Sequence, residues 1–397
     1  MSESSILVAF GGVSPEHEVS VLTAMQAISG LKEKGYHPRP LYITKTGKWL
    51  TGDILLNLEN FQDLKKLESE AVPCTLAHSE TGKPELRELK KAGLLQGYRH
   101  HPVSKVLVAF HGSEGENGSF QGLCETFNLP YTGSGVFGSS AGMDKQRAKD
   151  LCRSAKIPVV DGFVVHEEDW AEEMSPFINK ATQIGFPLIV KPVHLGSSIG
   201  VLRADDEKEL EEALESSFRY DAELLVEKAI EPLMEINCAV LGDEREMEVS
   251  ACERPIGSSE TLSFEDKYQR GDDSGGKGMA SADREVPADI PEKLRNQIQE
   301  LSRSIFKLFR AGGVARIDFL VNAETQQVYF NEINTIPGSF SFYLWEESGY
   351  TIANLMEKLL TIGDRRHKQK NSRVRSYETN LLSEKAVKGL KGLKTQK

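Results

Sequence analysis

The sequence has few of the features that mark secreted, membrane-spanning or zinc-binding proteins. Its 397 residues include five cysteines, which are widely spaced and form no C-x-x-C pair, so we predict neither a zinc site nor a disulfide framework. Each cysteine is expected to be a small buried side chain in a reducing compartment. No apolar run approaches the roughly 18 residues of a membrane span. Residues 1–10 also lack the basic segment and long apolar stretch of a secretion signal, so we expect a cytoplasmic protein.

Positive charge is also scarce in most of the chain. The sequence has 48 Lys and Arg against 59 Asp and Glu, a net charge of −11. Residues 363–397 alone carry eleven basic and three acidic side chains, which leaves a net charge of −19 on residues 1–362. So acidic a body argues against a nucleic-acid partner. The basic tail is expected either to dock on an acidic surface or to remain solvated.

The first third of the chain has the pattern of an α/β domain. Apolar runs at 6–10 and 106–110 each lead into a glycine turn, as buried parallel strands do. Helical spacing of apolar residues predicts a helix over 19–35, and a further strand is expected at 41–43. This order predicts a doubly wound, Rossmann-like unit with ligands beyond the carboxyl ends of its strands. Residues 55–104 show too little periodicity to be ordered from the sequence.

Helices and strands continue to alternate through the remainder of the chain. We expect helices at 144–155, 207–218 and 291–309, and strands at 187–190, 224–226, 314–321 and 328–333. The polar, glycine-rich residues 265–282 are expected to form a functional lid, because long loops inside a domain are seldom filler. Lys145, Arg147 and Lys149 by themselves indicate a solvated helix face.

Two strands near the end of the chain carry the chemistry of a cation site. Arg316 and Asp318 are two residues apart, as are Glu332 and Asn334, so each pair points to one face of its strand. A hairpin through residues 322–327 would join one cation, two carboxylates and one amide. Mg²⁺ takes such oxygen ligands together with substrate phosphates. The alternative is a solvated strand face with a salt bridge.

Two further stretches suggest nucleotide binding in different ways. Lys191 closes an apolar strand and precedes a glycine- and serine-rich loop whose backbone N–H groups suit phosphate oxygens. No P-loop sequence occurs, and the alternative is a lysine that reaches solvent beside a flexible turn. Residues 133–138 form a G-x-G-x-x-G, with Asp161 downstream, which would indicate a nicotinamide or flavin enzyme. That enzyme would leave the acidic hairpin without a role.

Taken in order, ten blocks resemble the D-alanine–D-alanine ligases of the ATP-grasp superfamily over about residues 5–360. The blocks are GGVSPEHEVS (11–20), HGSEGENG (111–118), YTGSG (131–135), MDK (143–145), VKP (190–192), GSS (196–198), VEK (226–228), KY (267–268), RID (316–318) and NEINTIPG (331–338). The resemblance implies an N-terminal Rossmann-like substrate domain (1–132), a central subdomain (133–226), a C-terminal subdomain with the metal site (227–362) and a separate tail (363–397). The G-x-G-x-x-G then becomes the linker into the central subdomain.

The resemblance also implies a reaction and a set of site residues. Such ligases phosphorylate the carboxylate of one D-alanine with ATP, and the amine of a second D-alanine then attacks the acyl phosphate. The implied ATP contacts are Lys145, Lys191, Glu227, Lys228, Glu235 and Lys267, and the implied ligands of two Mg²⁺ ions, or of Mn²⁺, are Asp318, Glu332 and Asn334. The implied catalytic and substrate-binding residues are Glu16, Ser197, Tyr268, Arg316, Gly338 and His111. A cytoplasmic homodimer that serves peptidoglycan synthesis is expected.

Two positions depart from the family pattern. Asn117 stands where an aspartate is usual, and Tyr343 stands where a serine commonly holds the carboxylate of the second amino acid. A phenol donates a hydrogen bond from a different distance than a serine hydroxyl does. We expect D-alanine as the second amino acid, and Tyr343 motivates the alternative, a ligase of the same family for another second amino acid. A nucleotide-binding regulator without turnover is the alternative from a different class.

Overall fold

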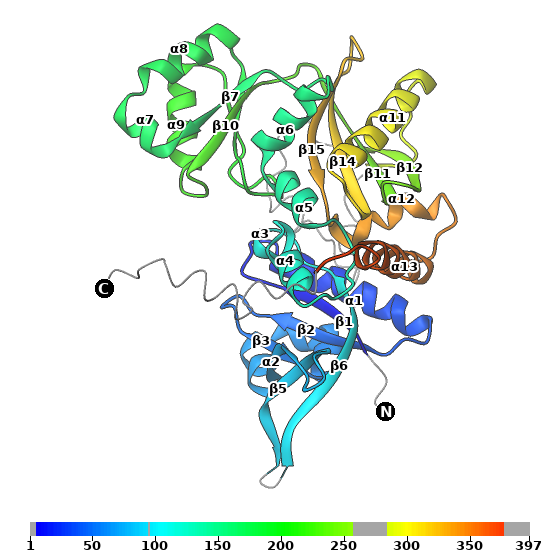
Figure 1. Ribbon diagram of the computed structural model, residues 1–397. Helices are drawn as coiled ribbons and strands as arrows, with labels where there is room; N and C mark the ends of the chain where they lie inside the picture. The colour runs from blue at the N-terminus through cyan, green and yellow to red at the C-terminus, as the bar shows by residue number, and fades with distance from the viewer. Residues whose placement is uncertain (1–4, 94–95, 257–283, 377–397) are drawn as a thin grey trace, which may run out of the picture.

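The structure is a computed structural model that describes residues 5–93, 96–256 and 284–376. It has three parts that follow one another along the chain (Figure 1). An N-terminal barrel lies at the bottom of the view, and two sheets with their helices lie above it. The sheets are four-stranded and five-stranded, in the orders β7-β10-β8-β9 and β13-β12-β11-β14-β15. The α/β class predicted from the sequence is confirmed.

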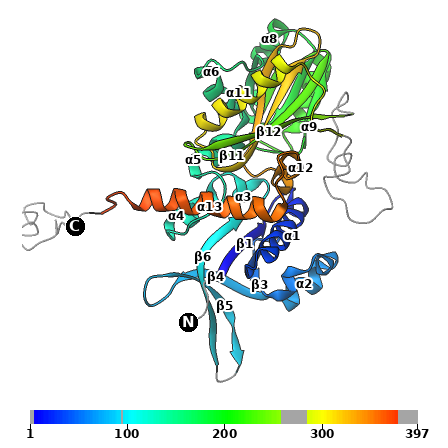
Figure 2. The same cartoon turned by 90° about the vertical axis from the view of Figure 1, so that its right-hand side faces the viewer.

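The N-terminal part is a barrel closed in the order β1 to β6. β1 (Ser5–Gly11) pairs in parallel with β2 (Pro38–Ile43) and β6 (Gln96–Val108), as the Rossmann-like pattern predicted. Residues 55–104, whose structure could not be predicted from the sequence, contain β4, β5 and most of β6, which close the barrel. The remaining elements are β3 (Trp49–Thr51), η1 (Asp53–Leu56), η2 (Leu58–Gln62), α2 (Leu64–Glu70), β4 (Val72–His78) and β5 (Pro84–Gly93). β5 and β6 form the long antiparallel hairpin that projects from the barrel (Figure 2).

Helices from both ends of the chain cover this barrel. α1 (His17–Glu33) packs against β1 and against α13 (Ile352–Asn371), which lies across the molecule between the barrel and the five-stranded sheet (Figure 2). Leu355, Met356 and Leu359 of α13 belong to the barrel's hydrophobic core. The expected tail boundary at residue 363 therefore falls inside a helix. α3 (Ser113–Glu116), α4 (Ser119–Thr126) and α5 (Val136–Met143) lead out of the barrel.

The four-stranded sheet has a core of its own. It contains β7 (Gly162–His166), β8 (Leu188–Pro192), β9 (Leu202–Ala204) and β10 (Glu223–Lys228). α7 (Glu167–Glu172), α8 (Ser175–Ile184) and α9 (Glu207–Ser217) pack on it, and Leu210 and Leu214 of α9 are fully buried. Because these leucines are four residues apart, they lie on one face of the helix. The opposite face of α9 carries the glutamates and the lysine.

The five-stranded sheet contains the predicted hairpin. Its strands are β11 (Leu233–Gly242), β12 (Met247–Pro255), β13 (Arg284–Glu285), β14 (Gly313–Asn322) and β15 (Val328–Asn334). α6 (Lys145–Ser154) and α11 (Glu292–Leu308) pack against it. The strand β15 is followed by η4 (Gly338–Ser341) and α12 (Tyr343–Glu346). The helices expected at 144–155 and 291–309 are thus confirmed within two residues at each end.

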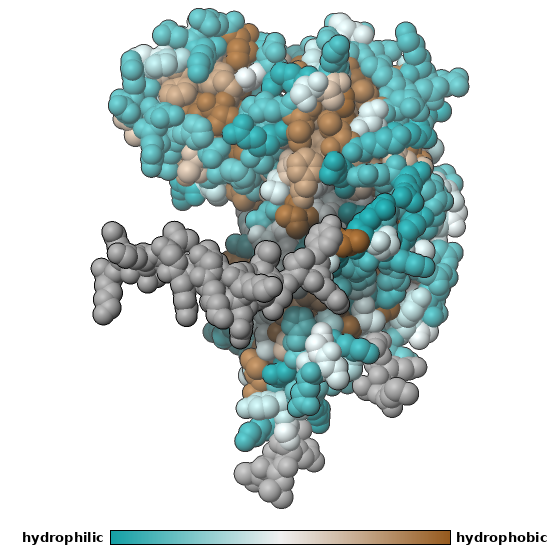
Figure 3. All heavy atoms as spheres, viewed as in Figure 1, coloured by the Kyte–Doolittle hydropathy of each residue, from teal (hydrophilic) through white to brown (hydrophobic). Residues whose placement is uncertain are grey.

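The five cysteines are free and buried, as predicted. None of the helices within the described ranges has the length and apolar character needed to cross a membrane. The face shown in Figure 3 is mostly hydrophilic, and its hydrophobic side chains gather in the upper part of the view, near β7 and along β14 and β15. These strands belong to the two sheets that carry the candidate site. The lid expected at 265–282 lies outside the described residues.

Candidate active site

The acidic hairpin predicted from the sequence is present in β14 and β15. Asp318 lies opposite Glu332, and Arg316 lies opposite Asn334. Arg316 donates from Nε and Nη2 to the two carboxylate oxygens of Asp318, both at 2.7 Å. Asn334 Nδ2 donates to Asp318 Oδ2 at 3.0 Å. The predicted grouping of one cation, two carboxylates and one amide is therefore present, and so is the salt bridge of the alternative, between Arg316 and Asp318, although Asp318 is only 8% exposed.

Negative charge accumulates around Asp318. Burial raises the pKa of this carboxyl, Arg316 lowers it, and Glu332 and Glu253 raise it, so that the pKa lies above its ordinary value. A divalent cation beside Asp318 and Glu332 would offset the repulsion, and two carboxylates with an amide oxygen fit Mg²⁺. Within the described ranges, this hairpin included, no group of three or more His, Cys, Asp or Glu side chains is arranged to hold a metal ion. The remaining ligands here would be phosphate or water oxygens.

Two lysines converge on one buried glutamate. Lys149 Nζ lies 2.6 Å from Glu227 Oε1, and Lys191 Nζ lies 2.5 Å from Glu227 Oε2. Lys191 also donates to the side-chain oxygen of Asn331 at 3.1 Å. Burial alone would raise the pKa of Glu227, but the two ammonium groups lower it to about 2. Lys191 is thus fixed by a carboxylate next to the acidic hairpin, so the alternative of a lysine that reaches solvent is wrong.

Lys149 is the residue that the sequence interpretation missed. Its side chain is 1% exposed, whereas the basic residues of this helix suggested a solvated face. Arg147, two residues earlier, does lie in solvent with a 69% exposed side chain. Burial lowers the pKa of Lys149 and Glu227 opposes this shift. The difference follows from the helix period, because residues two apart on a helix point to different sides.

Lys145 connects the hairpin to the glycine-rich loop. Its ammonium group lies 3.5 Å from Glu332 Oε2 and donates to the carbonyl oxygen of Leu195. Its backbone N–H donates to the carbonyl oxygen of Val193 at 3.1 Å. Lys145 and Lys191 therefore contact two consecutive residues of β15, Glu332 and Asn331. Both ammonium groups are nine-tenths buried or close to it, so each is a strong charge for an incoming anion.

The glycine-rich loop closes onto the N-terminal barrel. Ser197 and Ser198 have left-handed backbone angles, with φ of 53° and 58°. Ser197 Oγ donates to Glu16 Oε1, just before α1. A side chain at Gly196 would place its Cβ 3.0 Å from Glu16 Oε2, so the close approach favours glycine. The Glu16–Ser197 part of the implied triad is thus present, and its third member, Tyr268, lies outside the described residues.

His111 lies buried behind Glu16 at the end of β6. Its Nε2 lies 2.7 Å from the hydroxyl of Thr23 in α1, and its carbonyl oxygen accepts from Ser14 Oγ at 2.8 Å. Burial lowers the pKa of His111 to about 4. The ring is therefore neutral near pH 7. It can orient a substrate group but carries no charge toward it.

Glu116 is a second buried group that the sequence did not single out. Its two carboxylate oxygens accept from the N–H groups of Gly112 and Ile336, each at 3.0 Å. Burial raises the pKa of Glu116 to about 7, and the neighbouring Glu16 and Glu332 add to the rise. The carboxylate joins the HGSEGENG and NEINTIPG blocks. In the sequence, the only indication of a role for Glu116 was its position inside the HGSEGENG block.

The end of the NEINTIPG block forms a strained turn. Gly338 begins η4, in which Ser339, Phe340 and Ser341 all have positive φ. Ser339 N donates to Thr23 Oγ1 at 3.0 Å, which anchors the turn to α1. Positive φ is costly for residues other than glycine. The turn is held by this bond and by the burial of Phe340, so that Gly338 lies at the junction of barrel and hairpin.

Tyr343 lies beside Arg316 in a small polar network. Its hydroxyl donates to Glu253 Oε2 at 2.8 Å, and the guanidinium of Arg284 lies 4.1 Å above the ring centroid. Arg284 also pairs with Glu253 Oε1 at 3.2 Å. Burial raises the pKa of Tyr343, and Glu253 raises it further while Arg316 opposes. The phenol is therefore neutral and locked in place.

The structure describes two of the three remaining implied ATP contacts, Lys228 and Glu235. Lys228 Nζ donates to the carbonyl oxygens of Gly185 and Phe186, at 3.0 Å and 2.7 Å, so its side chain supports the loop before β8. Its backbone N–H donates to Asp161. Glu235 lies on β11. Lys267 lies outside the described residues, with Tyr268.

Comparison with known proteins decides the family. Models described as "D-ala D-ala ligase N-terminus" and "D-ala D-ala ligase C-terminus" match residues 5–134 and 151–361. The D-alanine–D-alanine ligase of Thermosipho melanesiensis is 38% identical over 97% of this chain and 99% of its own length. The chain belongs to the D-alanine–D-alanine ligase family. This assignment replaces the dinucleotide interpretation of residues 133–138.

Solved structures of this ligase family agree with the fold. The D-alanine–D-alanine ligase from Coxiella burnetii superposes with a TM-score of 0.76 at 31% identity, covering 94% of this chain and 97% of that chain. The VanG D-Ala:D-Ser ligase from Enterococcus faecalis gives 0.74 at 28% identity, covering 91% and 99%. The family thus contains ligases named for different second amino acids, which bears on Tyr343.

Proposed function

We propose that this ligase joins two D-alanine molecules through an acyl phosphate, with one ATP converted to ADP and phosphate, to supply the dipeptide for peptidoglycan synthesis. The observation that carries the proposal is the contact of two buried lysines with the acidic hairpin, Lys145 with Glu332 and Lys191 with Asn331. Phosphoryl transfer is catalysed mainly by positioning the reactants and neutralising charge, and little covalent chemistry is required of the protein. Two buried ammonium groups opposite two carboxylates meet that need.

ATP would bind between the two sheets. Lys145 and Lys191 would contact its phosphates, Glu227 and Lys228 its adenine, and Glu235 its ribose, with Lys267 closing from the lid. Asp318, Glu332 and Asn334 would hold two Mg²⁺ ions, or Mn²⁺, which when bound supply further charge neutralisation. The role of Glu227 at the adenine is supported by its charge, because Lys149 and Lys191 lower the pKa of its carboxyl group and keep it ionised.

The first D-alanine would bind at the barrel. Glu16, which Ser197 holds by its donated bond, would accept from the substrate ammonium group. The neutral imidazole ring of His111 would lie near the same D-alanine molecule. This placement leaves the substrate carboxylate to face the phosphates that Lys145 and Lys191 hold. Tyr268 would complete the set with Glu16 and Ser197.

The second D-alanine would attack near Arg316. Its amine would add to the acyl carbon, and Arg316 with the backbone N–H of Gly338 would stabilise the oxyanion of the tetrahedral intermediate. Tyr343 would lie beside the second carboxylate. Because Tyr343 replaces a small serine and is fixed by Glu253, a ligase with another second amino acid is the alternative function. We further propose a cytoplasmic homodimer of three domains with a basic tail that follows α13.

The test is phosphate release from ATP and Mg²⁺ with single and paired D- and L-amino acids, with the products identified by mass. D-alanine alone should give release and one dipeptide. Turnover only with D-alanine plus a different partner would support the alternative function. No release with any pair that includes D-alanine would contradict the proposal.

A further inference from the structure

A second cavity lies in the barrel, away from the candidate active site. Its volume is about 400 Å³, and it lies between α1, β2, η1 and β6. Ser5, which lines it, begins β1, whereas Gly11 at the other end of β1 leads to the Glu16 site. With a rise of about 3.3 Å per residue, β1 separates the two by roughly 20 Å. The cavity is therefore distinct from the D-alanine and ATP sites.

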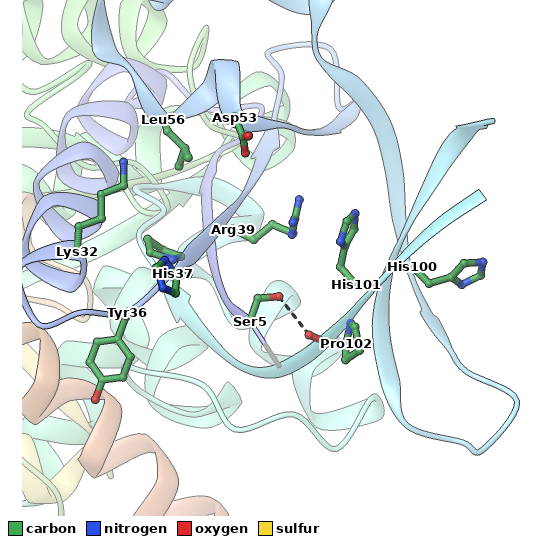
Figure 4. A pocket seen from close by; sticks show the side chains of 11 residues that line it. Ser5, Lys32, Tyr36, His37, Arg39, Asp53, Leu56, His100, His101 and Pro102 are labelled. Atoms are coloured by element: carbon green, nitrogen blue, oxygen red, sulfur yellow. Dashed lines mark hydrogen bonds between the residues drawn. The ribbon is translucent and has the colours of Figure 1, made fainter. Parts of the chain in front are cut away.

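Cationic side chains dominate this cavity. Lys32 of α1 and Arg39 of β2 line it, with Asp53 as its acidic lining residue, and His101 of β6 lines it with its Nε2 already 2.8 Å from Glu88 Oε1. Figure 4 shows Arg39 and His101 extending from their strands into the same space, with Asp53 above and Ser5 below them. His100 points away on the opposite side of β6, as strand alternation requires. On a chain of net charge −11, this grouping of cations is unusual.

Arg39 has donors without an acceptor. Its Nε is buried and makes no hydrogen bond, and no carboxylate lies within 4 Å of its guanidinium among the described residues. Lys32 likewise forms no ion pair in that part of the chain. A buried donor is stable only when an acceptor reaches it. Arg39 is therefore prepared for an anionic group that enters the cavity.

We propose that this cavity binds the phosphate group of a small soluble molecule. A phosphate offers three terminal oxygens and close to two negative charges, which match the two cations of the cavity, Lys32 of α1 and Arg39 of β2. A carboxylate has two oxygens, and a bidentate arginine alone would use both. The cavity is larger than a bare phosphate needs. Asp53 would accept from a hydroxyl or amino group on the rest of the ligand, so a hydroxylated phosphate ester is the class that fits.

Glycerol 3-phosphate is a suitable probe, with glycerol and sodium chloride as controls at equal concentration and ionic strength. The full chain is first saturated with ADP and Mg²⁺, so that the ATP site is filled. Melting temperature is then measured against probe concentration, and the dissociation constant follows from the dependence. We expect a saturable rise with glycerol 3-phosphate and with inorganic phosphate, and none with glycerol.

Variants test whether the rise in melting temperature comes from binding in this cavity. Arg39→Gln should raise the dissociation constant at least tenfold, and Lys32→Gln, on the exposed side of α1, several-fold. Arg99→Gln is the matched control, because Arg99 lies exposed on β6 outside the cavity; its dissociation constant should equal that of the unmodified chain. If Arg39→Gln does not fold, Lys32→Gln decides. The proposal would be overturned if both cavity variants showed the same rise in melting temperature as the unmodified chain, or if the phosphate probes raised it no more than sodium chloride does. A larger rise with lactate, a hydroxylated carboxylate, would also overturn it.

Discussion

Replacing Lys149 by methionine tests the buried charge network most sharply. Methionine keeps the length and apolar stem of lysine but leaves Glu227 paired with Lys191 alone. Removing one partner of a buried ion pair typically costs about 3–5 kcal/mol. Because Lys191 Nζ stays 2.5 Å from the carboxylate, we expect the lower end, about 3 kcal/mol. At about 2–4 °C per kcal/mol for large domains, the melting temperature should fall by about 6–12 °C.

The matched control is Arg147→Met on the same helix. Arg147 is exposed, and its contact to Asp150 is 3.4 Å long, so its removal should change stability by less than about 0.5 kcal/mol. Glu227→Gln should destabilise more than Lys149→Met, because it leaves two buried ammonium groups without a carboxylate. Thermal unfolding followed by circular dichroism gives all three values. Lys149→Met melting within about 2 °C of Arg147→Met would refute this account of the network.

Three other changes address the site. Glu332→Gln should lower kcat at least about 100-fold, through lost charge stabilisation, while the melting temperature stays unchanged; a 10-fold or smaller loss in steady-state assays would argue against a metal role. Tyr343→Ser should change mainly the KM for the second amino acid; unchanged kinetics would remove Tyr343 from substrate selection. Glu116, whose pKa is raised to about 7, stays protonated in the folded chain after it ionises in the unfolded chain. Its contribution to stability therefore falls by about 3 kcal/mol as pH rises from 4.5 to 7. Urea denaturation of Glu116→Gln should lack that fall, and parallel pH profiles for both proteins would contradict the shift.

The hairpin of β14 and β15 was predictable because it depends on local rules. The two-residue period places Arg316 with Asp318 and Glu332 with Asn334, and the turn residues between them fix the pairing. The position of Lys191 at a strand end was equally local. These are also the positions at which the family blocks are densest, so the pattern and the resemblance pointed to the same residues.

Other features depend on contacts between distant segments. The burial of Lys149 requires α6 to pack against β15 so that the lysine reaches Glu227 of β10, and the sequence of α6 alone has the composition of a solvated helix. The closure of the barrel involves β3, which has three residues, β4, which contains a proline, and β5, which has many charged residues, so that no clear alternation marks them as strands. α13 packs in the N-terminal core although it lies at the other end of the chain. No local sequence pattern predicts such contacts between segments that lie far apart in the chain.

The acidic composition gives the few buried cations their importance. A chain of net charge −11 offers no general attraction to ATP, so Lys145 and Lys191 would have to supply the local positive potential. Both are held by neighbouring carboxylates, which keep them in position without an anion present. Their loss should therefore weaken ATP binding more than the loss of an exposed lysine does.

The most direct test of the central claim follows one oxygen atom through the reaction. D-Alanine labelled with ¹⁸O in its carboxylate is incubated with the chain, ATP and Mg²⁺, and the products are analysed by mass spectrometry. Carboxylate attack on the terminal phosphorus, followed by amine attack on the acyl carbon, transfers one ¹⁸O to each phosphate released. We predict D-alanyl-D-alanine and singly labelled phosphate in equal amounts. Unlabelled phosphate, or phosphate without dipeptide, would contradict the proposed reaction.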